Sequence, residues 1–209
     1  MTETSESLKT IMPLITFVLG IFAAPLVEYL KDKMKAKRVK KTLGLEIEDE
    51  ILNLSKHLVK VAKALKDAIK LKNGELEVGS IGKYIPRVIY MYSLGKAMDL
   101  SFGDFDEKQR NAMKSFFVQI DATNEYIKTL KNTEVASETL DKLIESYKRY
   151  LYTGSCMLYT MRVIINKGNF KKCENDKDII NAVFNELQIE FSNDDIAIKK
   201  ILKFGSVRG

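Results

Sequence analysis

The 209-residue sequence has little of the chemistry on which most enzymes depend: it contains no tryptophan, one histidine and two cysteines. The histidine, His57, has no arginine partner of the kind that helical ribonucleases use, and no Glu-x-x-His pair indicates a di-iron bundle. Cys156 and Cys173 lack the Cys-x-x-Cys spacing of zinc and redox sites, so we expect unpaired thiols. The 11 glycines match no phosphate-binding loop. The sequence therefore predicts no enzyme, no cofactor and no metal site.

The alternation of apolar and polar residues that predicts β-strands is also missing, and apolar residues recur instead at alternating steps of three and four. Three segments, 43–72, 106–132 and 140–165, each carry such a heptad seam. The seams are, in order, Ile47, Ile51, Leu54, Leu58, Val61, Leu65 and Ala68; Met113, Phe116, Ile120, Thr123, Ile127 and Leu130; and Leu140, Ile144, Tyr147, Leu151, Gly154, Leu158, Met161 and Ile165. Because such helices bury their seams by packing side by side, we expect an all-α fold with an antiparallel helical bundle over 43–168.

A shorter apolar stretch, 85–100, lies between the first two long helices. Gly74, Gly79 and Gly82 precede it and predict a loop. Pro86 suits the first turn of a helix, because proline is well tolerated there. We therefore expect a shorter bundle helix that begins near residue 85.

The C-terminal region, 169–209, begins with a polar stretch and is expected to form a helical extension of the bundle. An apolar helical pattern runs from Ile179 to Leu187. A last short helix is predicted to start at Ser192, with Asp195 as its capping partner, and to stop at Gly205.

Charge is absent from one long run, Ile11 to Val27, which has 17 residues. As a helix this run is about 26 Å long, slightly less than the hydrocarbon core of a bilayer, so flanking residues such as Leu30 must contribute. We therefore predict a short tail at 1–10 and a single transmembrane helix at 11–30. Its candidate membrane-span residues are Ile11, Leu14, Phe17, Gly20, Phe22, Ala24 and Val27.

Other interpretations of this run are weaker but stay open. A cleaved signal peptide needs a basic start, and this chain has Glu3 and Glu6 there instead. A helix lying flat on a membrane needs a polar face, which residues 11–27 lack. A buried core helix of a soluble protein is the remaining alternative, because the run is near the lower length limit for a span. Pro13 and Pro25 lie near its ends and leave its middle uninterrupted.

A basic cluster follows the run directly, in a juxtamembrane neck at 31–42. Its seven bases, the candidate lipid-headgroup residues, are Lys31, Lys33, Lys35, Lys37, Arg38, Lys40 and Lys41. Residues 31–41 hold a net charge of +6, whereas residues 42–209 hold only +2. Because basic loops stay in the cytoplasm, we expect the N-terminus outside the inner membrane and the body in the cytoplasm, beside the anionic inner leaflet of the lipid bilayer. A topology signal without a specific lipid ligand explains the cluster more simply, and nucleic acid is disfavoured as a partner.

Four further features allow other functions. The acidic cluster from Glu46 to Glu50 is the densest candidate for an acid-base site of a membrane-tethered enzyme, although carboxylates in a first turn also suit a helix dipole. The lysines between Lys56 and Lys70 form either a solvated face or a nucleic-acid contact. Gly20 and Ala24 make a weak dimerisation signal in the span. Tyrosines on two predicted helices form core packing or an aromatic contact patch: Tyr84, Tyr90 and Tyr92, and Tyr147, Tyr150, Tyr152 and Tyr159.

The layout as a whole, with one N-terminal span at 11–30, a lysine-rich neck and a small helical cytoplasmic body, is similar to that of small membrane effectors in bacterial phage-defence systems, some of them linked to retrons. The resemblance covers the architecture and no specific residues. It implies a toxic effector that a partner holds silent and whose release perturbs the inner membrane. In that case the segment from Ile11 to Val27 assembles into a multi-copy lesion.

From the residues themselves we predict a single-pass membrane protein that acts through self-association or a protein partner. The heptad seam of the first long helix is the candidate association seam, since a seam longer than the bundle can cover stays free for another copy or another protein. Its residues are Ile47, Ile51, Leu54, Leu58, Val61 and Leu65.

Overall fold

A computed structural model describes the backbone of residues 3–77, 79–80, 82–166 and 175–197, and the side chains of these residues apart from 3–11 and 14. Within these ranges the chain forms six α-helices, one short 3-10 helix and no strand. The helices pack against one another around a shared hydrophobic core. The all-α prediction is therefore confirmed.

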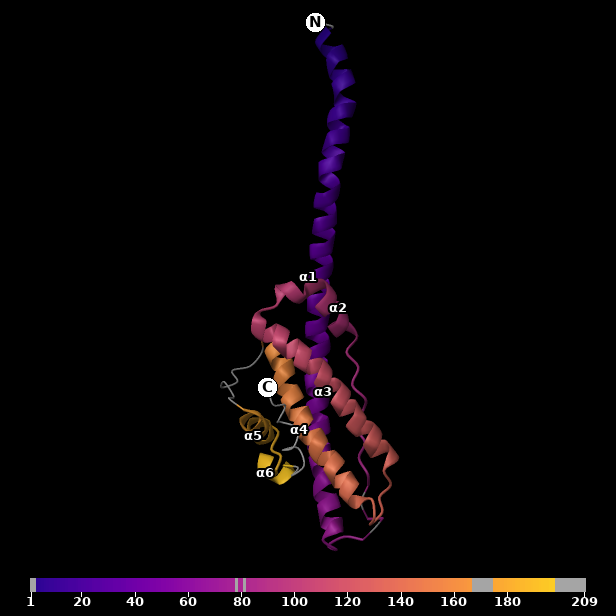
Figure 1. Cartoon of the computed structure of the whole chain (residues 1–209), viewed down its shortest axis with the longest axis vertical. Helices are drawn as coiled ribbons and strands as arrows, with labels where there is room; N and C mark the ends of the chain where they lie inside the picture. Colours follow the sequence, from indigo (N-terminus) through magenta and orange to yellow (C-terminus); the bar gives the residue numbers. More distant parts are fainter. Residues whose placement is uncertain (1–2, 78, 81, 167–174, 198–209) are drawn as a thin grey trace, which may run out of the picture.

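The first helix, α1 (Glu3–Lys72), is one continuous helix of 70 residues, about 105 Å long at 1.5 Å per residue. Figure 1 shows it as a rod whose upper part stands clear of the other labelled elements and whose lower part runs through the body. The helix continues through Pro13 and Pro25 and through the predicted boundaries of span, neck and bundle. The neck is thus helical and joins the apolar run to the body without a loop.

Two long helices, α3 (Glu107–Asn132) and α4 (Leu140–Ile164), form the body together with the lower part of α1. A capping box starts α3, because the Asp106 carboxylate accepts the Gln109 N–H at 2.7 Å and the Gln109 side chain accepts the Asp106 N–H at 3.1 Å. The predicted seam of α3 is confirmed, since its buried residues are Met113, Phe116, Ile120, Thr123, Ile127 and Leu130.

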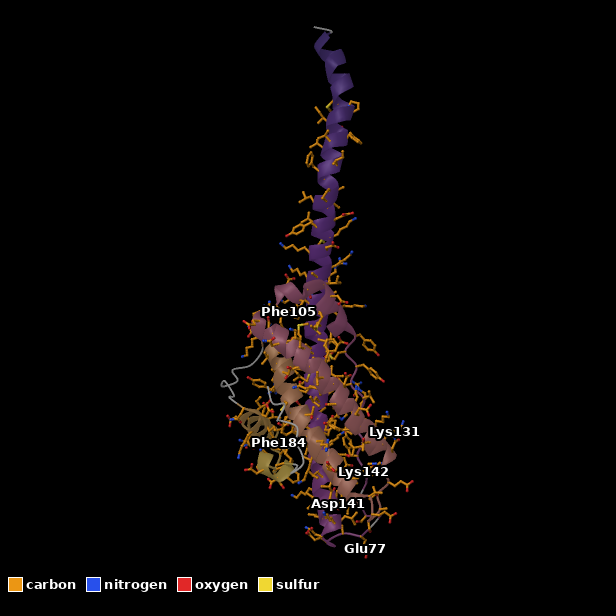
Figure 2. All side chains as sticks on the ribbon, viewed as in Figure 1. Glu77, Phe105, Lys131, Asp141, Lys142 and Phe184 are labelled. Carbon is orange, nitrogen blue, oxygen red and sulfur yellow. The ribbon has the colours of Figure 1, made fainter. Side chains whose placement is uncertain are left out.

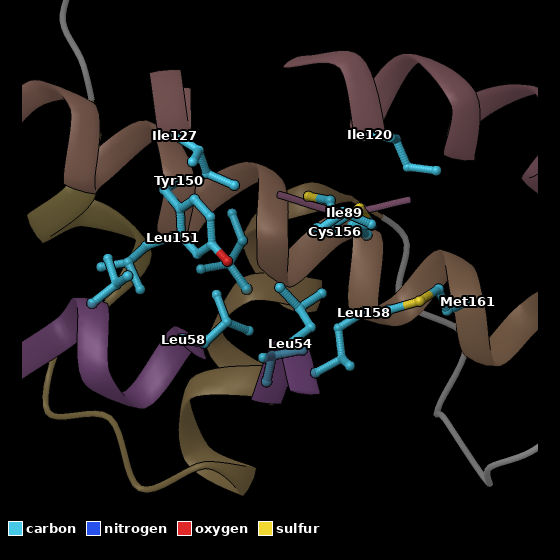
Figure 3. Close-up of a cluster of buried hydrophobic side chains, with 14 of the residues drawn as sticks. Leu54, Leu58, Ile89, Ile120, Ile127, Tyr150, Leu151, Cys156, Leu158 and Met161 are labelled. Atoms are coloured by element: carbon cyan, nitrogen blue, oxygen red, sulfur yellow. The ribbon is translucent and has the colours of Figure 1, made fainter. Parts of the chain in front are cut away.

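Helix α4 is the central element, because it contacts α1, α3 and the two C-terminal helices. Six of its eight predicted seam residues are buried, while Ile144 and Ile165 are half-buried, and α4 also buries residues outside that seam, including Tyr150 and Cys156. Cys156 is a free thiol, as expected, and Cys173 lies outside the described residues. Figure 3 shows side chains of α1, α3 and α4 in this core, among them Leu54, Leu58, Ile120, Ile127, Tyr150, Leu151 and Leu158.

The predicted helix over 85–100 is correct only in its second half. The helix α2 begins at Tyr92 and ends at Ser101, and the 3-10 helix η1 (Phe102–Asp104) follows it. Residues 82–91, which we call the strap, are not helical. Pro86 therefore does not start a helix. It disfavours helical backbone at Ile85, the residue before it.

The strap is held in place by side chains that bond its backbone. The Asn124 amide accepts the N–H of Ile89 at 2.9 Å and donates to its C=O at 3.0 Å. The Tyr147 hydroxyl accepts the N–H of Tyr84 and donates to its C=O, both at 3.1 Å. These contacts replace the hydrogen bonds that a helix would have supplied, so backbone polar groups in the interior stay paired.

The C-terminal part that the structure describes consists of α5 (Asp176–Glu186) and α6 (Asn193–Ile196), which pack on α4. The Asn175 side chain caps α5 by accepting the Asp178 N–H at 3.0 Å. The predicted cap of the last helix is confirmed, since the Asp195 carboxylate accepts the Ser192 N–H at 2.7 Å. That helix ends at Ile196 rather than at the predicted Gly205, and residues 198–209 lie outside the described part.

Candidate functional site

The upper part of α1 carries a long run of exposed, large apolar side chains. Phe17, Leu19 and Phe22 are 67%, 62% and 74% exposed, and Figure 2 shows side chains projecting from the upper part of α1 with no other helix beside them. Residues 17–22 are consecutive and carry no charge, so they place apolar surface all around the helix. Such a helix is typical of the core of a large protein or of a membrane span. We call residues 12–27 the apolar rod.

No described part of the body buries the apolar rod, so the described residues lend no support to its interpretation as a core helix of this chain's own fold. In the described ranges no helix meets the combined length and apolarity needed to cross a bilayer, and the transmembrane helix predicted at 11–30 lacks that support. The side chains of Ile11 and Leu14 lie outside the described part. The other predicted span residues are all exposed: Phe17, Gly20, Phe22, Ala24 and Val27.

The basic neck divides into two parts. Six of its bases are exposed, namely Lys31, Lys33, Lys35, Lys37, Arg38 and Lys41. Lys40 instead contacts the body, because its Nζ donates to the Asp104 C=O at 2.8 Å and lies 4.4 Å from the centroid of the Phe105 ring. Lys40, one of the candidate lipid-headgroup residues, thus fastens η1 and Phe105 to α1.

The body begins at a short distance from the apolar rod. Among the α1 side chains that the structure describes, Ala36 is the first that is buried, with 7% exposure. It lies about 14 Å beyond Val27 along the helix. A lipid headgroup layer is about 5–8 Å thick on each side of the hydrocarbon core, so this interval is about twice that thickness. Lys31, Lys33 and Lys35 fall within this interval.

The predicted association seam of α1 does not form a free surface. Ile47, Leu54, Leu58, Val61 and Leu65 are fully buried in the chain's own core, and Ile51 is half-buried against it. The seam packs mainly on α4, which the heptad pattern alone does not identify as its partner. In this structure the seam is thus covered by the chain itself and is not free for another copy or another protein.

Two residues of the acidic cluster, Glu46 and Glu50, contact other parts of the fold. The Glu46 carboxylate accepts the N–H groups of Tyr92 at 2.7 Å and Ser93 at 2.9 Å, where α2 begins. Glu50 is buried, and its carboxylate lies 3.5 Å from the Arg87 guanidinium of the strap. Burial raises the pKa of Glu50, and Arg87 opposes that change only in part. Among the residues described, no group of three or more acidic, histidine or cysteine side chains could hold a metal ion.

His57 is half-buried, as a boundary residue should be, and its Nδ1 forms a hydrogen bond with the Tyr84 hydroxyl. Burial lowers the pKa of His57, and the charges of Arg87 and Lys60 lower it further. The contact joins α1 to the strap. Sequence reasoning missed it because Tyr84 was placed on a helix rather than on the strap.

The tyrosines do not form one patch. Tyr147 and Tyr150 lie in the core, and burial raises the pKa of Tyr147 to about 12. Tyr90 and Tyr92 are exposed, and their rings stack with centroids 6.3 Å apart. The described chain therefore offers a pair of exposed aromatic rings beside α2, too small to serve as a contact surface by itself.

Comparison of this chain with protein-family models, with curated proteins and with solved structures finds no match. Its function is therefore inferred from its own residues. The surface that most needs a partner is the apolar rod, together with the exposed bases that follow it.

Proposed function

We propose that this chain is a single-pass membrane protein that holds its helical body at the cytoplasmic face of the inner membrane and acts through association with another protein. The observation that carries the proposal is the apolar rod, which has no polar side between Phe17 and Phe22 and is covered by no described part of the chain. Apolar surface in water costs about 25 cal/mol per Å². A bilayer removes the rod from water on every side at once.

Charge supports the orientation. The exposed bases of the neck all follow the rod, and only Lys9 precedes it. Positively charged segments near a span stay in the cytoplasm, which places the body on that side. Each base near an anionic leaflet contributes about 1 kcal/mol of attraction. Lys31, Lys33 and Lys35 lie nearest to the rod and are the bases that we assign to headgroup contact.

An association role is favoured over catalysis because the best candidate catalytic groups are committed to the fold. Glu46 bonds the start of α2, Glu50 faces Arg87, and His57 bonds Tyr84. A nucleic-acid role is disfavoured because the excess positive charge is concentrated in the neck, while residues 42–209 carry a net +2.

The finer proposal is a membrane-perturbing effector of a bacterial anti-phage defence system. It draws on the shared layout of an N-terminal span, a basic neck and a small helical body. In this proposal the body receives a signal from a partner, and the rods of several copies assemble in the membrane.

Membrane insertion is tested with the full chain and a variant that combines Phe17→Arg with Phe22→Arg. Both positions are highly exposed, so the body should fold normally. Each arginine near the centre of a span costs about 2.5–3.5 kcal/mol, so the variant should leave carbonate-washed membranes for the soluble fraction. Met34→Arg, also at an exposed position but beyond the rod, is the matched control and should stay in the membrane. A wild-type chain that washes off would overturn the proposal.

The effector proposal needs a separate readout, which is the membrane potential of cells that express the chain. We expect depolarisation with the full chain and none with the Phe17→Arg, Phe22→Arg variant or with a chain lacking residues 1–30. A full chain that inserts yet leaves the potential unchanged, even with its partner removed, would contradict an effector and favour a tethered scaffold.

A further inference from the structure

A second apolar surface lies on the back of α1, beside the body. Leu45, Leu52 and Val59 are 55%, 61% and 44% exposed. They are spaced by seven residues, so they form one stripe along the helix. Each lies two positions before a fully buried core residue, Ile47, Leu54 or Val61, and therefore points away from the core. No described element covers this stripe.

At its C-terminal end the stripe enters a cleft of about 370 Å³ between α1 and residues 188–191. Val59 belongs to both the stripe and the cleft. Ala62, Ile189 and Phe191 supply further apolar lining. Stripe and cleft thus make one docking face, which extends from Leu45 to Lys70 over about 38 Å of helix.

The second half of the docking face, from Lys56 to Lys70, is positively charged. Lys63, Lys66 and Lys70 line the cleft, and Lys56 lies about two turns before Lys63 on the same side of α1. The acidic groups there are Asp67 and Glu190, and Glu190 already pairs with Lys66. The first half instead carries Glu48 and Asp49 between Leu45 and Leu52. An occupant therefore gains from carboxylates over the second half of the face, around Val59 and the cleft, and from apolar side chains along the whole stripe.

Two other occupants of the docking face are disfavoured, namely the lipid bilayer and a second copy of this chain. The reasons given for the bilayer and for an antiparallel copy rest on the proposed membrane anchor. Val59 lies about 44 Å beyond Leu30 along α1, too far for the same bilayer to cover it. A second copy in parallel would set Lys56 and Lys63 against their own copies, and like charges repel. An antiparallel copy would direct its apolar rod away from the membrane that holds the first.

We propose that this face docks an amphipathic, acidic helix of a protein partner. Leucine-like side chains of the partner occupy the stripe, with one or two residues entering the cleft, and its carboxylates meet the lysines. This deepens the proposed function by naming the kind of partner and the surface that receives it. Helix-in-groove recognition uses such anchors at spacings of three, four and seven residues.

The test uses the detergent-solubilised full chain and a synthetic helical peptide that carries leucine at every seventh position with glutamates beside them. We expect saturable binding by fluorescence anisotropy, and little binding of the same peptide with lysine in place of glutamate. Leu52→Asn should weaken binding about tenfold or more, because burial of one leucine is worth about 1.5–3 kcal/mol. Lys56→Glu combined with Lys63→Glu should weaken it through charge, more at low salt than at high salt.

Matched controls are Leu100→Asn and Lys131→Glu, which change an exposed leucine on α2 and an exposed lysine on α3. Neither should alter binding. Equal binding of the two peptides, or a Leu52→Asn variant that binds normally, overturns the proposal. So does sedimentation showing a dimer that Leu52→Asn dissociates, because a second copy would then be the occupant. Peptide binding needs no bilayer, so its failure is distinct from failure of the insertion test.

Discussion

The residues whose side chains could take part in catalysis instead hold the helices and the strap of this chain together. Glu46 bonds the first N–H groups of α2, and His57 bonds Tyr84 of the strap. Tyr147 satisfies both backbone groups of Tyr84. Each hydrogen bond of this kind contributes about 1 kcal/mol net to the stability of the fold, and a buried polar group left unpaired costs more than that. Such residues resemble catalytic candidates in the sequence only because their partners lie far along the chain.

Glu50 makes stability depend on pH in a defined direction. Its pKa is raised above 4.5, chiefly by burial, so the folded chain binds a proton there more readily than the unfolded chain. Stability from this group therefore falls as the pH rises from 4.5 through the raised folded-state pKa. Glu50→Gln removes this dependence and keeps an acceptor for Arg87. We expect the melting temperature of the variant, relative to wild type, to be higher at pH 7.5 than at pH 4.5.

The measurement is thermal unfolding of both proteins in detergent at matched ionic strength. His57 titrates in both and cancels in the difference. A difference between variant and wild type that stays constant with pH would contradict the buried, raised-pKa carboxylate. Arg87 is well exposed, so losing its charged partner leaves it in water at little cost.

Between elements, α1 and α4 approach each other closely at Gly154. A Cβ atom at Gly154 would lie 2.9 Å from Cδ2 of Leu58 and 3.6 Å from Cδ1 of Leu54. Leu58 is fully buried and has little room to move. Gly154 is therefore needed for the short distance between the two helix backbones, although the heptad pattern marks it only as one more seam position.

We expect Gly154→Val to destabilise the body by about 1–3 kcal/mol, because its branched side chain overpacks the interface between α1 and α4. The matched control is Gly95→Ala on α2, where an added Cβ meets nothing within 4 Å. That change should stabilise by about 0.5–1 kcal/mol, since alanine restricts the unfolded chain. Urea unfolding followed by circular dichroism gives both values. A neutral Gly154→Val would mean that α1 and α4 are less tightly packed.

At the scale of the whole molecule, α1 joins the apolar rod to the body as one helix with no loop between them. A change in the tilt or rotation of the body is then carried directly to the rod. Lys40 strengthens this connection, because it ties η1 to α1 where the body begins. A docking event near Leu52 would act on the same helix that enters the membrane in the proposed function.

Spin labels at Phe22→Cys and Leu45→Cys, with Cys156 and Cys173 replaced by serine, test this continuity. We expect a narrow distance distribution centred near 35 Å, as 1.5 Å per residue requires. Inserting Gly-Ser-Gly-Ser after Lys33 should broaden it. Inserting Ala-Ala-Lys-Ala at the same place should keep it narrow and lengthen it by about 6 Å. A broad distribution without any insertion would show that the neck bends freely.

Much of the helical architecture is readable from local periodicity. The seam of α3 was predicted in full, because its six buried residues follow heptad spacing and it packs chiefly on one helix. The cap at Ser192 and Asp195 was also predictable, since the bonded groups lie three residues apart. The strap was not, because its backbone depends on Asn124 and Tyr147, which lie far away in the sequence.

The sequence by itself determined that the chain is helical, that an uncharged run precedes a basic cluster, and which stripes are apolar. Helical periodicity and charge placement are local properties, so spacing reveals them. The tertiary structure decided which apolar stripe of α1 is covered. It buried the predicted seam from Ile47 to Leu65 against the chain's own core and left Leu45, Leu52 and Val59 exposed. An apolar stripe of α1 is covered only by contacts with segments far along the chain, and those contacts depend on how the helices pack in space.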